Sequence, residues 1–187
     1  MLFLSLNSPL PTKLKSTFAH VLCSTFASAF DVEPPLLLNK KPDEALYEFR
    51  EFSAACMEAA LESPQYAANR RAALEKSAAD LGAAVHTVLK PHDEELMNLI
   101  AYLYAAIGIG VTGTVPGELT FHRCYFSKRY TPELCAFMSA FDSGFVSGLC
   151  GGGTLTFDTR ITEGAPCCHA IMNRQGTEDC SRPRKRI

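Results

Sequence analysis

The sequence lacks a strong excess of charge of either sign. Its 187 residues contain 18 lysines and arginines against 20 aspartates and glutamates, which gives a formal net charge of −2. A chain this close to neutral has no general attraction to nucleic acid or to an anionic membrane surface, so we expect neither as a partner. The one basic cluster, 182–186, lies near the end of the chain, where we expect a solvated tail over residues 175–187.

Signatures of disulfide, redox and phosphate sites are also missing. The eight cysteines include no pair with CxxC spacing, and a chain of this length can bury a core without disulfides. We therefore expect mostly reduced thiols and an intracellular compartment. The triple glycine 151–153 lacks the lysine and the strand, loop and helix order of a phosphate-binding loop. We predict no bound cofactor.

Acidic residues are absent from the first 30 positions, and the apolar stretch 18–30 is too short and too often interrupted by polar residues to cross a bilayer. Such a composition is typical of an organelle transit peptide, or of a secretory signal with 27–29 as its cleavage site. The other interpretation is an ordinary first helix over 11–30. We therefore treat residues 1–35 as a targeting segment or a first helix plus linker, and residues 36–174 as one domain.

Apolar residues then recur at helical spacing in four segments. The first begins near Asp43, the second follows Ser63-Pro64 and ends at Pro91, and the third extends from about 93 to 107. On the second segment, one face carries Leu74, Ala78, Leu81, Val85 and Val88. The fourth helix opens at Thr131-Pro132-Glu133 and carries Leu134, Phe137, Met138, Phe141 and Phe145.

Alternation with period two predicts three strands, at about 118–124, 154–161 and 167–173. Two of these strands follow the fourth helix and one precedes it. The sequence therefore predicts an α+β fold, in which N-terminal helices pack with a small antiparallel sheet and one long helix is inserted between strands.

The acid Asp142 borders the apolar stripe of the fourth helix. Helical phase places it near Cys135 and Met138, since seven residues advance a helix by nearly two turns. Burial raises the pKa of a carboxyl group into a range useful for acid-base chemistry. The other interpretation is a structural acid that pairs with Arg123 or Arg160.

Strand alternation divides the cysteines and histidines near the end of the domain. It places Cys167 and His169 on one face of the last strand and Cys168 on the other. A nucleophilic thiol needs a nearby base, which His122 or His169 could supply across the sheet. The default interpretation of each cysteine is a buried, inert thiol. A zinc site formed by His122, Cys124, Cys167 and His169 is a further alternative, although the usual spacing of zinc ligands is absent.

Several features occur in a fixed order between residues 119 and 172. They are a strand ending in Cys124, the helix start Pro132-Glu133-Leu134, Asp142 within that helix, and Glu163-Gly164-Ala165-Pro166 leading to Cys168. In this order the chain resembles the L-2-amino-thiazoline-4-carboxylic acid hydrolase family. The resemblance implies a hydrolase that opens a small cyclic amidine to a carbamoyl-cysteine.

Such a reaction needs an attacking group, an acid facing the amidine and a cation for the substrate carboxylate. The resemblance suggests Cys168 or Cys124 as nucleophile and Asp142 as the carboxylate facing the amidinium. Candidate bases are His122 and His169. The candidate substrate-binding residues are Arg123, Arg160 and Glu163, since a guanidinium holds a carboxylate at two points.

The alternative function is a non-catalytic small-molecule-binding module with the layout of vinyl-reductase-type sensor domains. An enzyme should gather Asp142, a cysteine and an arginine around one polar cavity. A binding module should instead have a deep apolar cavity with few charges, lined by Phe121, Phe137, Phe141 and Met138. Both functions take a small molecule as partner, and both are compatible with a homo-oligomer. A zinc-stabilised structural domain is the third candidate.

Overall fold

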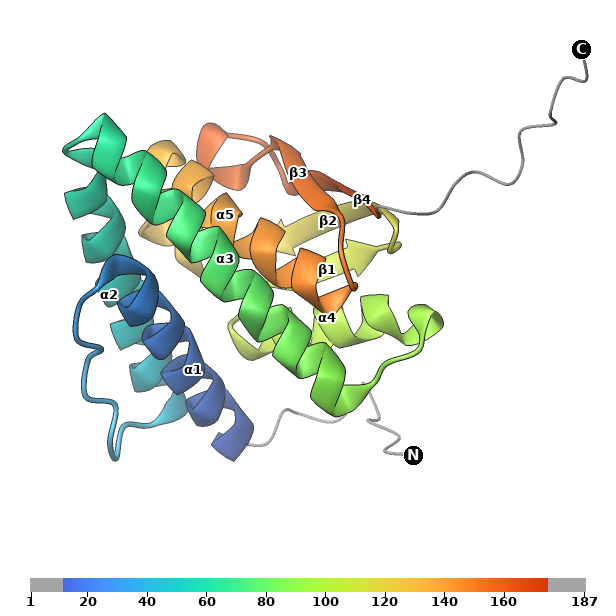
Figure 1. The fold of residues 1–187 in the computed structure, drawn as a ribbon, viewed down its shortest axis with the longest axis horizontal. Coiled ribbons are helices and arrows are strands. Elements are labelled where there is room, and N and C mark those ends of the chain that lie inside the picture. Colours follow the sequence, from blue (N-terminus) through green and yellow to red (C-terminus); the bar gives the residue numbers. More distant parts are fainter. Residues whose placement is uncertain (1–11, 175–187) are drawn as a thin grey trace, which may run out of the picture.

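The computed structural model describes residues 12–174, which form five α-helices and one four-stranded antiparallel sheet (Figure 1). The helices are α1 (Thr12–Phe30), α2 (Pro42–Leu61), α3 (Pro64–Leu89), α4 (Leu96–Ala106) and α5 (Pro132–Leu149). The strands are β1 (Gly110–Gly113), β2 (Gly117–Arg123), β3 (Thr154–Thr159) and β4 (Cys168–Asn173), in the spatial order β1-β2-β4-β3. The predicted α+β class is confirmed, and α5 is the long helix inserted between strands.

Local sequence explains where the helices begin. Proline occupies the first position of α2, α3 and α5, where its fixed backbone suits a helix and its missing N–H costs nothing. Before α5, the hydroxyl of Thr131 accepts a hydrogen bond of 3.3 Å from the backbone N–H of Leu134. These signals fix the start of the helix that carries Asp142.

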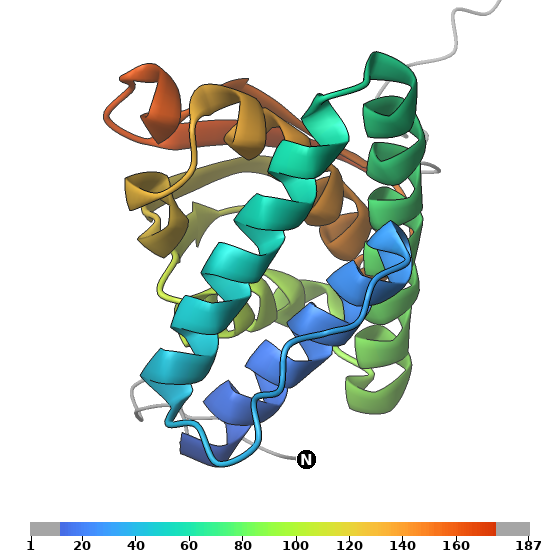
Figure 2. The same ribbon diagram turned by 90° about the vertical axis from the view of Figure 1, so that its left-hand side faces the viewer.

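Helix α1 is part of the same core as the rest of the domain. Ala19, Leu22 and Phe26 are buried, and α1 lies beside α2 in front of the sheet in Figure 2. This is the arrangement expected if residues 11–30 form an ordinary first helix. Residues 1–11 of the predicted targeting segment and the predicted tail over 175–187 lie outside the described residues. None of the helices in the described part is long and apolar enough to cross a membrane.

Helices α3 and α5 cross at very short range, and α5 lies between α3 and the sheet (Figure 1). A methyl group added at Gly144 would lie 2.0 Å from the carbonyl oxygen of Glu75, and one at Gly148 would lie 2.1 Å from that of Ala79. Glycine is therefore required where the two backbones touch. The contact ends near the end of α5, which leaves Val88 78% exposed although it was predicted on the buried face.

The sheet turns one face toward α5 and the other away from it. In the β2–β4 pair, Leu119 lies opposite Ala170 and Phe121 opposite Cys168, and all four are buried. The sequence analysis missed β1, because its residues are glycine-rich and carry only one buried apolar side chain, Val111. Pairing with β2, rather than local preference, makes this segment a strand.

Candidate functional site

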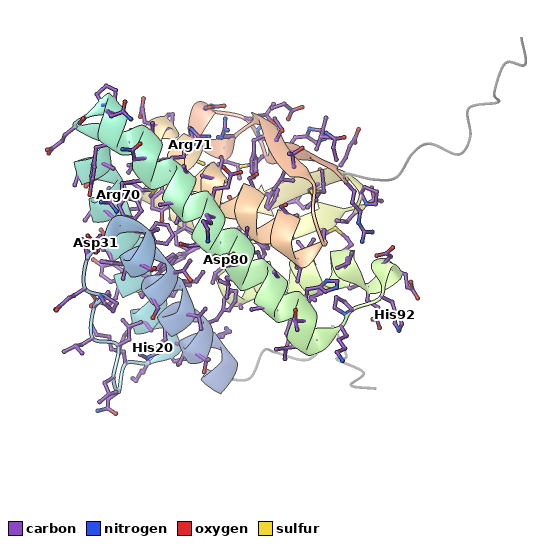
Figure 3. All side chains as sticks on the ribbon, viewed as in Figure 1. His20, Asp31, Arg70, Arg71, Asp80 and His92 are labelled. Atoms are coloured by element: carbon purple, nitrogen blue, oxygen red, sulfur yellow. The ribbon has the colours of Figure 1, made fainter. Side chains whose placement is uncertain are left out.

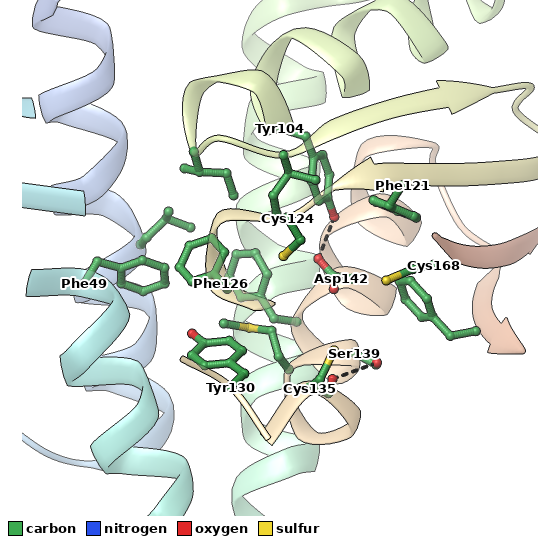
Figure 4. A pocket seen from close by; sticks show the side chains of 16 residues that line it. Phe49, Tyr104, Phe121, Cys124, Phe126, Tyr130, Cys135, Ser139, Asp142 and Cys168 are labelled. Atoms are coloured by element: carbon green, nitrogen blue, oxygen red, sulfur yellow. Dashed lines mark hydrogen bonds between the residues drawn. The ribbon is translucent and has the colours of Figure 1, made fainter. Parts of the chain in front are cut away.

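A cavity of about 60 Å³ lies where α5 meets the sheet and the N-terminal helices (Figure 4). Seven of its sixteen lining residues are aromatic: Phe49, Phe121, Phe126, Phe141, Phe157, Tyr104 and Tyr130. Because one water needs roughly 10–15 Å³ of such space, the cavity has room for a few waters or a very small organic molecule. Its polar lining consists of Asp142, Ser139, the two tyrosine hydroxyls and three thiols.

Among the residues of 12–174 that line the cavity, Asp142 is the only charged one. Its Oδ1 accepts a hydrogen bond of 2.7 Å from the hydroxyl of Tyr104 on α4. Burial raises the pKa of Asp142 from its ordinary value of 3.8 to about 6, while the Tyr104 hydrogen bond and the positive charge of Arg160 act in the opposite direction. The carboxyl group is thus partly protonated near pH 6 and mostly ionised above pH 7.

The Asp142 carboxylate forms no ion pair within the described part of the chain, and the charge of Arg160 acts on it from beyond ion-pair distance. Within residues 12–174, no lysine, arginine or histidine nitrogen lies within 4.0 Å of its oxygens. The described side chains give it no hydrogen bond other than the one from Tyr104. An ionised carboxylate in such surroundings is costly, because burial removes it from water without the compensation of an ion pair.

Three cysteines from three segments line the same cavity: Cys124 after β2, Cys135 on α5 and Cys168 on β4. Burial raises the pKa of Cys124 to about 12 and that of Cys135 to about 11, and it also raises the pKa of Cys168. The Cys168 sulfur accepts a hydrogen bond of 3.3 Å from the backbone N–H of Ile161. At neutral pH all three are therefore thiols rather than thiolates, and none is activated as a nucleophile.

Of the two candidate arginines, only Arg160 lies beside the cavity. Its Nε and Nη2 each donate a hydrogen bond of 3.3 Å to the hydroxyl of Ser139, which lines the cavity. Its guanidinium also lies 5.5 Å from the ring centre of Phe157 and pairs with Glu163 at 3.2 Å. Arg123, at the end of β2, is exposed, and neither Arg123 nor Glu163 lines the cavity.

The candidate bases His122 and His169 lie outside the cavity. His122 is exposed and hydrogen-bonds the hydroxyl of Thr112 at 2.6 Å. His169 donates from Nδ1 to Asp158 at 2.9 Å, and its Nε2 lies 3.6 Å from Glu118. Because neither histidine lines the cavity that the three thiols line, neither is placed to take a proton from them. The other histidines do not line it either: His86 bonds the carbonyl of Leu149, while His20 and His92 are exposed (Figure 3).

The geometry also contradicts the zinc alternative. Strand β2 ends at Arg123, and Cys124 caps the 3₁₀ turn Tyr125–Lys128; its thiol lines the cavity while His122 stays outside. His122 and Cys124 therefore do not share a face, as a common zinc site would require. At the start of β4, Cys168 is buried, whereas His169 and the preceding Cys167 are half-buried, as alternation predicts. Within the described part of the chain, no three His, Cys, Asp or Glu side chains are placed to hold a metal ion.

Sequence reasoning missed the two tyrosines of the site. Tyr104 belongs to the apolar stripe of α4, and Tyr130 lies in the turn before α5, where its hydroxyl shares a hydrogen bond of 2.6 Å with Ser53 on α2. A tyrosine within a buried stripe must find a polar partner for its hydroxyl, which is the signal that could have found Tyr104. Phe137, predicted to line an apolar cavity, instead packs on Phe30.

The cavity therefore combines both of the predicted alternatives. It gathers Asp142, cysteines and a neighbouring arginine, as an enzyme should, but its wall is mainly apolar with a single charge, as a binding module requires. No protein-family model, curated protein or solved structure matches the chain.

Proposed function

We propose that the protein binds a very small molecule that has an apolar frame and one cationic group, of the amidine or amine class. The observation that carries this proposal is the half-buried Asp142 carboxylate, which lines a mainly apolar cavity and has no described cation within 4.0 Å, the charge of Arg160 acting on it from farther away. A ligand cation would supply the missing charge. Apolar and aromatic walls would then bury the rest of the molecule, as in most ligand sites.

The energetic reason lies in desolvation. An isolated buried carboxylate is unfavourable, whereas a carboxylate paired with a hydrogen-bonding cation recovers part of that cost. Burial of the Asp142 carboxyl is the largest cause of its raised pKa, so the ligand-free site carries this cost at neutral pH. Binding a cation relieves it, and this gives the site a preference for charged over neutral molecules of the same shape.

The size of the cavity limits the ligand. About 60 Å³ accommodates a molecule with only a few heavy atoms unless side chains move. Acetamidinium is a suitable probe because it has a planar cationic head and one methyl group. Acetamide has nearly the same shape without the charge, and it serves as the matched neutral probe.

The experiment measures the binding of acetamidinium and acetamide at pH 7.5 by ligand-observed NMR. The wild-type protein should bind acetamidinium saturably and acetamide at least tenfold more weakly, since a tenfold preference is only about 1.4 kcal/mol. Asp142→Asn should lose this preference. Glu163→Gln removes a carboxylate outside the cavity and should retain it. Equal binding of the two probes by the wild type would contradict the proposal.

A second candidate function is hydrolysis of a cyclic amidine, the activity that the resemblance implies. The observation that favours it is the presence of Asp142 and Cys168 on one cavity with Arg160 at its wall. Since both histidines lie elsewhere, Asp142 would have to take the thiol proton itself. The candidate roles would then be Cys168 as nucleophile, Asp142 as base and Arg160 as the contact for the substrate carboxylate.

Hydrolysis is tested by incubating the protein with 2-amino-thiazoline-4-carboxylate and following the proton NMR spectrum for the ring-opened product. Turnover that is lost in both Cys168→Ala and Asp142→Asn, but kept in His169→Gln, would support this second function. An unchanged substrate that still shows saturable binding would favour the binding module. If the substrate is neither converted nor bound, hydrolysis is refuted and the acetamidinium experiment decides on the binding function.

A further inference from the structure

The hydroxyl of Tyr104 is the one described side-chain group that hydrogen-bonds the Asp142 carboxylate. The tyrosine ring is held on two sides, by Phe121 with ring centres 5.6 Å apart and by Phe145 with ring centres 6.4 Å apart. Only 3% of the residue is exposed. Because the ring cannot swing away, the direction of the hydrogen bond to Oδ1 is fixed by packing.

We infer that Tyr104 is a positioning residue of this site, which fixes Oδ1 of Asp142 so that Oδ2 is presented, ionised, to a ligand cation in the cavity. This inference rests on the proposed binding function. Tyr104 and Asp142 come from different helices, α4 and α5, and both point into the cavity in Figure 4. Without the hydroxyl, either oxygen could turn toward the aromatic wall.

The hydrogen bond also favours the charged form of the acid. It lowers the pKa of Asp142 against the larger effect of burial. The other titratable or charged groups that face this carboxyl come from its own helix α5 and from four further segments of the chain. They are Cys124 after β2, Tyr130 before α5, Cys135 on α5, Arg160 before the turn Ile161–Glu163, and Cys168 on β4.

A purely structural tyrosine in the same cavity provides the comparison. The hydroxyl of Tyr130 is also buried, but it hydrogen-bonds Ser53, which in turn donates to the carbonyl of Phe49 at 2.7 Å. Tyr130 thus completes a hydrogen-bond network between the turn and α2 without contacting Asp142. Tyr130→Phe removes the same atom from the same cavity, and this makes it the matched control for Tyr104→Phe.

The test follows the carboxyl carbon of Asp142 by ¹³C NMR during a pH titration, without ligand. The wild-type midpoint should lie near the pKa of about 6. Tyr104→Phe should raise this midpoint by on the order of one pH unit, because the ionised form loses its one donor among the described side chains. Tyr130→Phe should leave it unchanged. Should Tyr104→Phe fail to fold, 3-fluorotyrosine at position 104 keeps the ring and is a stronger donor, and it should lower the midpoint.

The second readout is the affinity of acetamidinium as a function of pH. At pH 6, a one-unit rise in the pKa of Asp142 reduces the ionised fraction about fivefold, so Tyr104→Phe should bind about fivefold more weakly there and recover as the pH rises. An unchanged Asp142 midpoint in Tyr104→Phe, or equal shifts in both tyrosine variants, would overturn the inference. If the wild type does not bind acetamidinium but Tyr104→Phe still raises the Asp142 midpoint, only the proposed function is refuted.

Discussion

Replacing Asp142 with asparagine should stabilise the protein at neutral pH. It should also remove the part of the pH dependence of stability that comes from the Asp142 carboxyl group. The pKa of this carboxyl is raised from 3.8 to about 6 in the folded chain, and burial is the main cause. The folded state therefore binds the proton more tightly than the unfolded state. The stability that this group contributes is fully present below about pH 4, and it is lost as the pH rises toward and through 6.

The magnitude follows from the pKa shift. A difference of about two units between the folded and unfolded states corresponds to about 3 kcal/mol of lost stability at neutral pH. Between pH 4.5 and pH 7.5, where the measurement is practical, the linkage relation gives a loss of about 2 kcal/mol. This is a large fraction of the stability of a domain of this size, so the cost is measurable.

The assay is urea unfolding of the wild type and of Asp142→Asn at both pH values, and the quantity is the difference between the two proteins. Taking the difference cancels all other titrating groups that the substitution does not affect. The stability of Asp142→Asn relative to wild type should increase by about 2 kcal/mol from pH 4.5 to pH 7.5. A difference that is independent of pH, or one that moves in the opposite direction, would refute the reasoning.

Three further predictions follow from the packing, the thiols and the outer face of the sheet. Gly148→Ala should lower the free energy of unfolding in urea by about 3 kcal/mol or more, because the added methyl group would lie 2.1 Å from the Ala79 carbonyl oxygen. Gly110→Ala is the control, since its methyl group would meet nothing nearer than 4.0 Å. Equal losses of stability in the two variants would contradict the account of the helix crossing. At pH 8, iodoacetamide should label Cys124 and Cys135 far more slowly in the folded protein than in urea, as checked by peptide mass spectrometry, because burial raises the pKa of each thiol. The pKa of His169 is raised, chiefly by its hydrogen bond to Asp158. Asp158→Asn should therefore lower the titration midpoint of the His169 imidazole observed by NMR. An unchanged midpoint would show that this contact is not formed in solution.

The sequence predicted those parts of the fold that depend on local patterns. Helical phase correctly placed Asp142 beside Cys135 and Met138, since all three line one cavity. Strand alternation correctly separated Cys168 from its neighbours. Both patterns are properties of one element at a time, and one element's periodicity is enough to identify its buried face.

The missing parts depend on contacts between distant elements. Strand β1 exists because it pairs with β2, and Tyr104 became a site residue only because α4 packs beside Asp142 on α5. The histidines were expected to serve the thiols across the sheet, but neither His122 nor His169 lines the cavity. The extent of the α3 and α5 contact likewise depends on three glycines, Gly82, Gly144 and Gly148, that no apolar pattern reveals.

The most direct test of the central claim is a crystal structure of the protein grown with acetamidinium at pH 7.5. The account predicts one amidinium in the aromatic cavity, with a nitrogen within hydrogen-bond distance of Oδ2 of Asp142 and the Tyr104 hydroxyl still on Oδ1. An empty cavity at saturating acetamidinium, or an amidinium that pairs with surface carboxylates such as Asp158 and Glu118 while Asp142 stays alone, would contradict it.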